Sequence, residues 1–413
     1  MSRQLFRNAR IYTPKDRGRP LAGGDQGELA HFPHGAILVE DGKIAAVGNE
    51  ASVRTSNSLP AGIREVDCGG RCMIPGFVDP HTHMCFTELR EAEFAMRLSG
   101  TPYLDILKEG GGILSSVRAI AAASEDQLYQ KTLERVTTAL ELGSTTLEIK
   151  SGYGLDTENE LKMLRIIDRV AKSSQVDVVA TFLGAHAVPT AFRNEPSRFI
   201  DMVIGEMLPA VRLQGVAKFC DVFCEQGVFS INESRRLLAA AKGMGLRAKL
   251  HADEVYDLGG AGLAAELGAC SADHLLAASE KNIEAMAAAG VIAVLLPATA
   301  YSLRKSYARA RLMIELNLPV ALATDCNPGS SFTESMQFVV CLAVLNMHMS
   351  PAEALTAATL NAAYSIGMAD RVGSLDQGKQ ADFLLLDGKT PAILAYHAGV
   401  SSVACIYKNG QKI

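Results

Sequence analysis

The chain has 413 residues, of which 48% are hydrophobic and 21% are charged, and its formal net charge at pH 7 is −5. This length predicts more than one small core, and the charge balance offers no basic footprint for nucleic acid or an anionic membrane. The longest apolar stretches fall short of the ~20 residues that cross a bilayer, and the N-terminus lacks the apolar core of a signal peptide. We therefore expect a cytoplasmic globular protein that binds neither nucleic acid nor membrane.

Nine cysteines are scattered along the chain. An odd number at irregular spacing fits reduced thiols better than a disulfide framework. Cys220 and Cys224 would lie roughly 13 Å apart on a strand, too far to share a metal ion. We interpret the cysteines as small buried side chains.

Both ends of the chain carry β-strand signals. The apolar runs Gly35–Glu40 and Lys43–Gly48 are joined by an Asp-Gly pair, which predicts a hairpin. The polar segment Leu21–Pro33 is expected to be a loop. Strand-then-turn patterns recur near the C-terminus at Ala381–Gly388 and Val403–Gly410. We predict a small β domain built from residues 1–75 and 365–413.

The middle of the chain, residues 76–364, alternates apolar strand candidates with helical patterns. The strand candidates are Gly76–His83, Thr145–Lys150, Val176–His186, Phe219–Glu225, Leu246–His251, Cys270–His274, Val291–Pro297 and Pro319–Asp325. The helical patterns include Gln127–Leu142, Thr157–Ala171 and Ser234–Gly243. This alternation predicts an α/β fold of the (β/α)8 TIM-barrel type, whose active site lies at the carboxyl ends of the strands. A doubly wound sheet is the alternative, but it would not explain polar residues at so many strand ends.

A His-x-His pair, His81 and His83, ends the first of these strands. Residues two apart on a strand share a face, roughly 6.6 Å apart, so two imidazoles can converge on one cation. His251 and Asp325 end other strand candidates. Three imidazoles and a carboxylate suit zinc or iron, with room for a water. We predict one Zn2+ or Fe2+/Fe3+ per chain on these residues, although a carboxylated Lys150 that bridges a second metal stays open.

Two further residues are candidates for the chemistry, together with Asp325. Glu254 lies three residues after His251, where it could serve as general base toward a metal-bound water. The alternative is a purely structural role, in which the carboxylate of Glu254 stabilises a helix N-terminus. His274, directly after Asp273, could stabilise an oxyanion or orient the water, or could be a structural histidine.

Other residues are candidates for holding a substrate. Arg90 lies seven residues after His83 and is a natural clamp for a carboxylate, although a solvated arginine would look the same in sequence. Tyr153 is flanked by glycines that let the backbone approach a ligand. The run Asn327–Ser331 brings an amide and hydroxyls beside Asp325. The glycines at 110–112 lack the Lys-Ser/Thr of a P-loop, and we interpret them as a flexible lid hinge.

Taken together, these motifs resemble the amidohydrolase superfamily. The resemblance covers essentially the whole chain and is carried by the Pro-Gly-Phe-Val-Asp-Pro-His-Thr-His run at 75–83, the His-Ala-Asp-Glu run at 251–254, the Asp-His pair at 273–274 and the Thr-Asp pair at 324–325. It implies a (β/α)8 barrel with a small β-sandwich built from both chain ends.

Further stretches are similar to one branch of that superfamily, which opens the ring of 4-imidazolone-5-propanoate to N-formimidoyl-L-glutamate in histidine degradation. They are residues 103–107, 110–114, 148–155, 181–186, 307–311 and 323–331. The resemblance implies contacts to substrate or product from Arg90, Tyr153, His186, Glu254, Asn327, Gly329 and Ser330. Thr87 and Glu88 replace the small residues common before the arginine, which leaves the shape of that loop open.

In the implied reaction, the metal lowers the pKa of its water from about 15.7 towards 7. Glu254 takes the proton, His274 and the metal hold the oxyanion, and Arg90 fixes the propanoate. One alternative is another amidohydrolase, such as a cytosine or guanine deaminase, whose substrates lack a carboxylate for Arg90. The other is a metal-free barrel that serves as a scaffold or binding protein, which the intact ligand set disfavours. We predict a small-molecule substrate with a carboxylate; the oligomeric state, a homodimer included, stays open.

Overall fold

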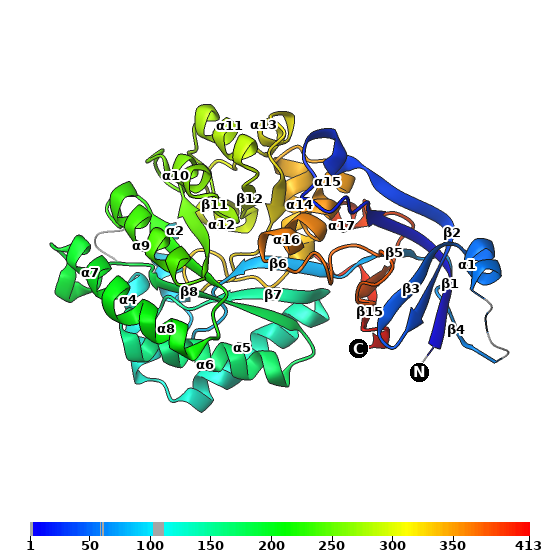
Figure 1. Ribbon diagram of the computed structural model, residues 1–413, viewed down its shortest axis with the longest axis horizontal. Coiled ribbons are helices and arrows are strands. Elements are labelled where there is room, and N and C mark those ends of the chain that lie inside the picture. Colours follow the sequence, from blue (N-terminus) through cyan, green and yellow to red (C-terminus); the bar gives the residue numbers. More distant parts are fainter. Residues whose placement is uncertain (1–2, 58, 60–61, 102–110) are drawn as a thin grey trace.

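The chain folds into a barrel of parallel strands wrapped by helices, with a second sheet from both chain ends beside it (Figure 1). The computed structural model describes residues 3–57, 59, 62–101 and 111–413. The stretch 103–107, which carries part of the resemblance, lies outside the described residues, and so does Gly110 of the expected lid hinge.

The barrel is an 8-stranded sheet whose strands pair in chain order and run parallel. Its strands are β6 (Phe77–Thr82), β7 (Ser144–Lys150), β8 (Asp177–Ala185), β9 (Phe219–Cys224), β10 (Arg247–Ala252), β11 (Ser271–His274), β12 (Ile292–Leu295) and β13 (Val320–Leu322). Beyond the last paired strands, the amide of Asp325 donates to the carbonyl of His81 at 3.0 Å, and that of His83 to the carbonyl of Cys326 at 2.9 Å. These bonds join the first strand to the segment after the last. The predicted TIM-barrel fold is confirmed.

Helices follow most of the strands and cover the outside of the barrel (Figure 1). They are α2 (Glu91–Leu98), α4 (Ile113–Ala122), α5 (Glu125–Glu141), α6 (Thr157–Ser173), α7 (Pro196–Met202), α8 (Leu208–Gln214), α9 (Ile231–Gly243), α10 (Gly260–Leu267), α11 (Glu280–Ala289), α12 (Pro297–Leu303), α13 (Ala310–Glu315), α14 (Met336–Asn346), α15 (Pro351–Ala357) and α16 (Leu360–Ser365). Short 3-10 (Thr190–Phe192) and π (Val203–Met207) segments lie around α7. Ser124 and Ser230 start α5 and α9 with capping boxes, so local chemistry sets where these two predicted helices begin.

The second sheet joins the two ends of the chain. Its strands are β1 (Arg3–Pro14), β2 (Leu29–Glu40), β3 (Lys43–Asn49), β4 (Arg64–Asp67), β5 (Cys72–Pro75), β14 (Phe383–Leu386), β15 (Val403–Lys408) and β16 (Gln411–Lys412). They lie in the order β16-β15-β14-β5-β1-β2-β3, with β4 beside β1. Successive residues of β1 point to opposite faces of the sheet. Leu5 and Phe6 lie in separate apolar clusters, so both faces of the sheet are packed. The α1 helix (Glu50–Ser56) and the short α17 (Ile393–Tyr396) complete this region. The expectation that both termini build a β-structure beside the barrel is confirmed, and this structure is one mixed sheet.

The hairpin prediction is confirmed, but the expectation of a loop at Leu21–Pro33 is wrong in part. Residues Gly23–Gly27 form a 3-10 turn, and β2 already begins at Leu29. The β1–β2 ribbon extends to a Pro14–Leu29 pair, with register shifts that let a long ribbon bend. The first half of β2 is largely open to solvent. The sequence of this exposed half therefore has a pattern typical of a loop.

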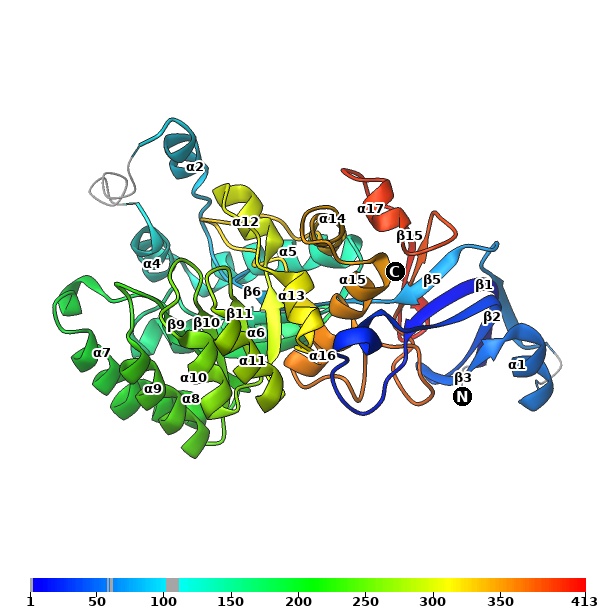
Figure 2. The same ribbon diagram turned by 90° about the horizontal axis from the view of Figure 1, so that it is seen from above.

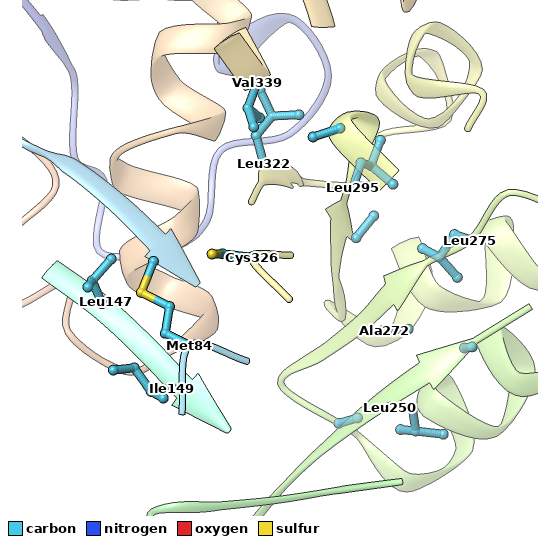
Figure 3. Packing of buried hydrophobic residues seen from close by; sticks show 14 of the residues in the cluster. Met84, Leu147, Ile149, Leu250, Ala272, Leu275, Leu295, Leu322, Cys326 and Val339 are labelled. Atoms are coloured by element: carbon cyan, nitrogen blue, oxygen red, sulfur yellow. The ribbon is translucent and has the colours of Figure 1, made fainter. Parts of the chain in front are cut away.

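A continuous apolar core lies between the barrel strands and the surrounding helices. In Figure 3, Leu147 and Ile149 project from β7 on one side, and Leu250 and Ala272 from β10 and β11 on the other. Parallel strands that are buried on both faces are mostly apolar, which is why the sequence showed them as apolar runs. This packing fixes the strand ends in place.

Seen from above, the terminal sheet lies at one end of the molecule and α7 at the other, while α2 projects from one side of the barrel (Figure 2). The nine cysteines are all free, and most are buried, as expected. Among the described residues, no helix has the length and apolar character to span a membrane.

Candidate active site

The two histidines of the His-x-His pair lie at the carboxyl end of β6. Both are buried, and their ring centroids are 5.3 Å apart. The backbone bonds that join β6 to the segment after β13 bring Asp325 to the same point. Its Oδ1 lies 3.6 Å from Nε2 of His81 and 3.6 Å from Nε2 of His83. The structure thus brings three of the predicted ligands together.

His251 reaches the same point from the end of β10. Its Nε2 lies 3.3 Å from Nε2 of His83, and one ring nitrogen from each of His81, His83 and His251 lies within 4.8 Å of the others. Nε2 of His81 is buried without a hydrogen-bond partner among the described residues. Buried ring nitrogens that face one another without donors call for a cation between them. The donor set therefore fits a divalent metal of the zinc or iron kind.

His274, at the end of β11, lies closer to this centre than the sequence indicated. Ligand atoms of His81, His274 and Asp325 also lie within 4.8 Å of one another. The backbone takes positive φ values at His274 (76°) and Asp325 (54°), which is uncommon for residues other than glycine. Such strained positions cluster at functional sites. Nε2 of His274 lies 3.7 Å from Oε2 of Glu254, so it stands between the ligands and the predicted base.

Buried carboxylates support the ligands from behind. Asp273 Oδ2 lies 2.6 Å from Nδ1 of His81, and Asp221 Oδ2 lies 3.1 Å from Nδ1 of His251. Thr299 donates its hydroxyl to Oδ2 of Asp325 at 2.6 Å, which leaves Oδ1 facing the histidines. A carboxylate behind Nδ1 holds the proton there and leaves the Nε2 lone pair for a metal. Each partner therefore aims its ligand at the centre.

Burial shifts the protonation of these groups. It lowers the pKa of His81 and His83 well below the usual value, reinforced by neighbouring cationic groups, and lowers the pKa of His274 to about 4. At His251, burial also lowers the pKa, but the contacts with Asp221 outweigh it and the net shift is upward. Burial raises the pKa of Glu254 to about 7. Neutral imidazoles can bind a metal, and a carboxyl group with a pKa near neutrality can both accept and return a proton.

An aromatic wall stands beside the histidines. His186, just past β8, stacks on His83 with ring centroids 4.9 Å apart, and Tyr153 lies 5.3 Å from His186. The carbonyl of Gly152 lies 3.0 Å from Nδ1 of His186, which ties the two loops together. Flat rings at this distance from the ligands form a surface on which a planar ring can rest.

A buried carboxylate organises the loop that carries Tyr153. Glu160, in the first turn of α6, accepts the amides of Gly152, Gly154 and Leu155 at 2.7–3.1 Å. A Cβ at position 154 would lie 2.4 Å from the amide nitrogen of Glu160, so only glycine fits there. The predicted flanking glycines therefore serve this turn.

Arg90 lies at the rim of the site, at the start of α2. Its Nε and Nη2 donate to Glu93 Oε2 at 3.0 and 2.7 Å, and its Nη1 lies over the backbone of Gly329. A Cβ at position 329 would lie 2.5 Å from Nη1, so glycine permits this approach. Arg90 and Gly329 both line a cavity of about 600 Å³, and the candidate metal ligands do not line it. The structure thus brings these two predicted substrate residues together. The loop that leads into α2 contains Thr87, which is partly buried, and Glu88, which is exposed.

The loop after Asp325 is held by its own side chains. Oδ1 of Asn327 accepts the amides of Gly329 and Ser330 at 2.8 Å each, and Nδ2 donates to the carbonyl of Asp325 at 2.7 Å. Nδ2 also lies 3.0 Å from the hydroxyl of Ser330. Asn327 therefore shapes the loop, and Ser330 is the more open of the two toward a ligand.

The sequence analysis gave no individual role to several residues that support the site. They are Glu148, Glu160, Asp221, Lys249, Asp253, Asp273 and Thr299. Asp253, for example, accepts the amides of residues 258–261 and so holds the loop after Glu254. The available signal was a charged residue inside an apolar strand, as at Asp221 and Lys249, because such a residue is buried only when it is paired.

Comparisons with known proteins agree with this geometry. The amidohydrolase family model matches residues 72–413, and the chain belongs to the amidohydrolase family. Within that family it belongs with the imidazolonepropionases of histidine degradation. It is 71% identical to the imidazolonepropionase of Desulfotalea psychrophila over 413 residues, which is 100% of both chains. It is 63% identical to that of Syntrophobacter fumaroxidans, over 99% of this chain and 96% of the other.

A solved structure supports the fold independently. The guanine deaminase of E. coli superposes with a TM-score of 0.73 over 100% of this chain and 99% of that one, at 16% identity. At such low identity the likeness concerns the fold. This likeness does not favour the deaminase alternative, because the relatives that match over the full length are imidazolonepropionases.

Proposed function

We propose that this chain hydrolyses the ring amide of 4-imidazolone-5-propanoate to give N-formimidoyl-L-glutamate. The observation that carries the proposal is a buried cluster of imidazoles beside Asp325 and Glu254, with Arg90 against Gly329 in the loop that follows Asp325. The names of the full-length relatives point to the same substrate. The intact donor set disfavours a metal-free scaffold.

The metal ligands in this proposal are His81, His83, His251 and Asp325. When bound there, a divalent cation supplies Lewis-acid polarisation and a water of lowered pKa. One Zn2+ or iron ion per chain fits the single cluster of donors. His274 adjoins the cluster, and we assign it to the reacting carbonyl oxygen, because as a neutral imidazole it can donate one hydrogen bond.

Glu254 moves the proton. A water adds to the ring carbonyl carbon, and the carboxylate of Glu254 accepts its proton. The same proton then passes to the ring nitrogen next to that carbon, so that the carbon–nitrogen bond breaks with a neutral leaving group. The former carbonyl carbon ends as the new carboxylate of the product. The raised pKa of Glu254 suits both transfers.

Arg90 binds the propanoate, and the aromatic wall holds the ring. The Nε–Nη2 edge of the guanidinium faces Glu93, while Nη1 lies over Gly329 and is available for a second carboxylate. Tyr153 and His186 contact the flat ring, and the Asn327–Ser330 loop closes the other side. A substrate without the carboxylate would leave Arg90 without its partner, which gives selectivity.

The remaining assignments are proposals of the same kind. We place the division between the β domain and the barrel at residues 75/76 and 364/365, between β5 and β6 and near the end of α16. We place the protein in the cytoplasm, because nine free thiols suit a reducing compartment.

The test is a direct comparison of substrates. Purified protein, reconstituted with Zn2+ or Fe2+, is given 4-imidazolone-5-propanoate, cytosine and guanine in parallel, and products are identified by mass. The proposal expects N-formimidoylglutamate from the first and no ammonia from the other two. Faster deamination of cytosine or guanine, or ring opening that persists in metal-free protein, would contradict it.

A further inference from the structure

Five charged side chains lie directly beneath the ligand cluster, inside the barrel. They are Glu148, Lys150, Asp221, Lys249 and Asp273, and all are 0% exposed. Burying a charge is costly unless it is paired, so the positions of these side chains relative to one another matter for stability. The proposed reaction gives no role to Glu148, Lys150 and Lys249 of this layer.

Lys150 is the hub of this layer. Its Nζ lies 2.8 Å from Glu148 Oε1, 2.9 Å from Asp221 Oδ2 and 3.8 Å from Asp273 Oδ2. Lys249 differs, because its Nζ donates to the carbonyl of Pro80 at 2.9 Å and stays 3.8–3.9 Å from Asp273 and Glu148. Among the described residues, Lys150 is the one lysine that contacts both aspartates.

Those two aspartates support different histidines through the same oxygens. Oδ2 of Asp221 lies 2.9 Å from Lys150 and 3.1 Å from Nδ1 of His251. Oδ2 of Asp273 lies 3.8 Å from Lys150 and 2.6 Å from Nδ1 of His81. One ammonium thus stands behind two ligands that come from β6 and β10, on opposite sides of the cluster.

We propose that Lys150, as an unmodified ammonium, is a positioning residue that holds Asp221 and Asp273 so that His251 and His81 both present Nε2 to the metal. The inference rests on the proposed metal centre. A fixed aspartate keeps the histidine proton on Nδ1, and without its cation the aspartate is free to move away. Lys150 acts through these carboxylates and does not touch the substrate.

The same contacts disfavour a carboxylated Lys150 that bridges a second metal. Among the described residues, the Lys150 ammonium is the one positive group that contacts Glu148, Asp221 and Asp273. A carbamate would replace it with a fourth negative group. The cost of unpaired buried charge is several kcal/mol. The layer is therefore built for an ammonium, which agrees with a single metal per chain.

The test compares two charge-balanced double variants, Glu148→Gln/Lys150→Met and Glu148→Gln/Lys249→Met. Each removes one carboxylate and one ammonium from the same buried layer, so their net charge is equal. Zn2+ affinity is measured on metal-free protein by competition with a chelator, with Glu148→Gln as the common reference. We expect the Lys150 variant to lose roughly 10- to 100-fold in affinity and the Lys249 variant clearly less than about tenfold.

A second readout distinguishes positioning from general damage. Nitrogen-15 spectra of metal-free protein report which ring nitrogen of each histidine carries the proton. We expect two histidines fixed as Nδ1–H in wild type and in the Lys249 variant, and exchanging between tautomers in the Lys150 variant. Equal loss in both variants, no loss in the Lys150 variant, or a Lys150 variant that fails to fold while its partner folds would overturn the inference. A wild type that binds no Zn2+ would instead contradict the proposed metal centre.

Discussion

The floor and the rim of the site are built in different ways. On the floor, His81, His83 and His251 sit on or beside strand ends, are buried, and are held by backbone bonds and carboxylates. On the rim, Arg90 begins a helix, has a side chain that is 13% exposed, and donates hydrogen bonds to Glu93. The floor is fixed by the barrel, whereas the rim depends on short loops.

This difference predicts how the two regions respond to mutation. A change on the floor removes a group that the chemistry requires, and nothing nearby can replace it. A change on the rim weakens the grip on one part of the substrate but leaves the chemistry intact. Activity should therefore collapse for floor variants and decline by limited factors for rim variants.

The largest effect is expected for His251→Ala. Loss of one of three converging imidazoles should abolish both metal retention and ring opening, while circular dichroism and the melting temperature show a folded barrel. Metal content by elemental analysis and turnover are measured together. His397→Ala, on the exposed C-terminal segment, is the control and should match wild type. Retained metal and activity in His251→Ala would move the centre elsewhere.

Glu254→Gln should rank next, with metal still bound and turnover slower by roughly two to four orders of magnitude. The amide is similar in size but does not accept a proton. Because burial raises the pKa of Glu254 to about 7, the carboxylate form that accepts the proton is lost as the pH falls. The wild-type kcat/KM should therefore decline on the acid side, and the variant should lack that limb.

Its control is Glu284→Gln, on the exposed side of α11. That variant should keep both the rate and the acid limb. A general base usually contributes far more than a factor of about three to the rate. If the rate of Glu254→Gln stayed within about threefold of wild type, another group would have to accept the proton of the water, and His274 is the nearest candidate.

Arg90→Met tests the rim and should cost about 3 kcal/mol in kcat/KM, roughly 150-fold, as expected for loss of a charge-assisted pair. Metal content should not change. Arg165→Met, at an exposed position of α6, is the control and should have little effect. A ring analogue without the propanoate should react equally with wild type and Arg90→Met; a normal rate of Arg90→Met on the acid would refute the carboxylate assignment.

The smallest effect is expected for Glu160→Gln. The amide end places a donor against the amides of Gly152 or Gly154, which costs about 1–3 kcal/mol and loosens the turn that carries Tyr153. The loss should appear mainly in KM, with metal affinity unchanged. Glu158→Gln, two residues away and not buried, is the control. A loss confined to kcat with KM unchanged would remove the turn from substrate binding.

The same contrast explains what could be predicted from sequence. The eight barrel strands and the strand-end ligands follow from local patterns, because apolar runs and their terminal polar residues are visible along the chain. The partnership of Asp221 with His251 depends on how β9 and β10 align, where His251 pairs with Phe223, and no local pattern fixes that register. The approach of Arg90 to Gly329 joins segments from opposite ends of the barrel sequence, so it too emerges only in three dimensions.

The metal content of purified protein tests the central claim most directly. Protein expressed with zinc or iron, freed of loosely bound ions and analysed for metal per chain, should contain close to one equivalent, and anomalous diffraction should place it among His81, His83, His251 and Asp325. Activity should rise in proportion to that occupancy. Near two equivalents, density at Lys150, or full activity without metal would contradict the account.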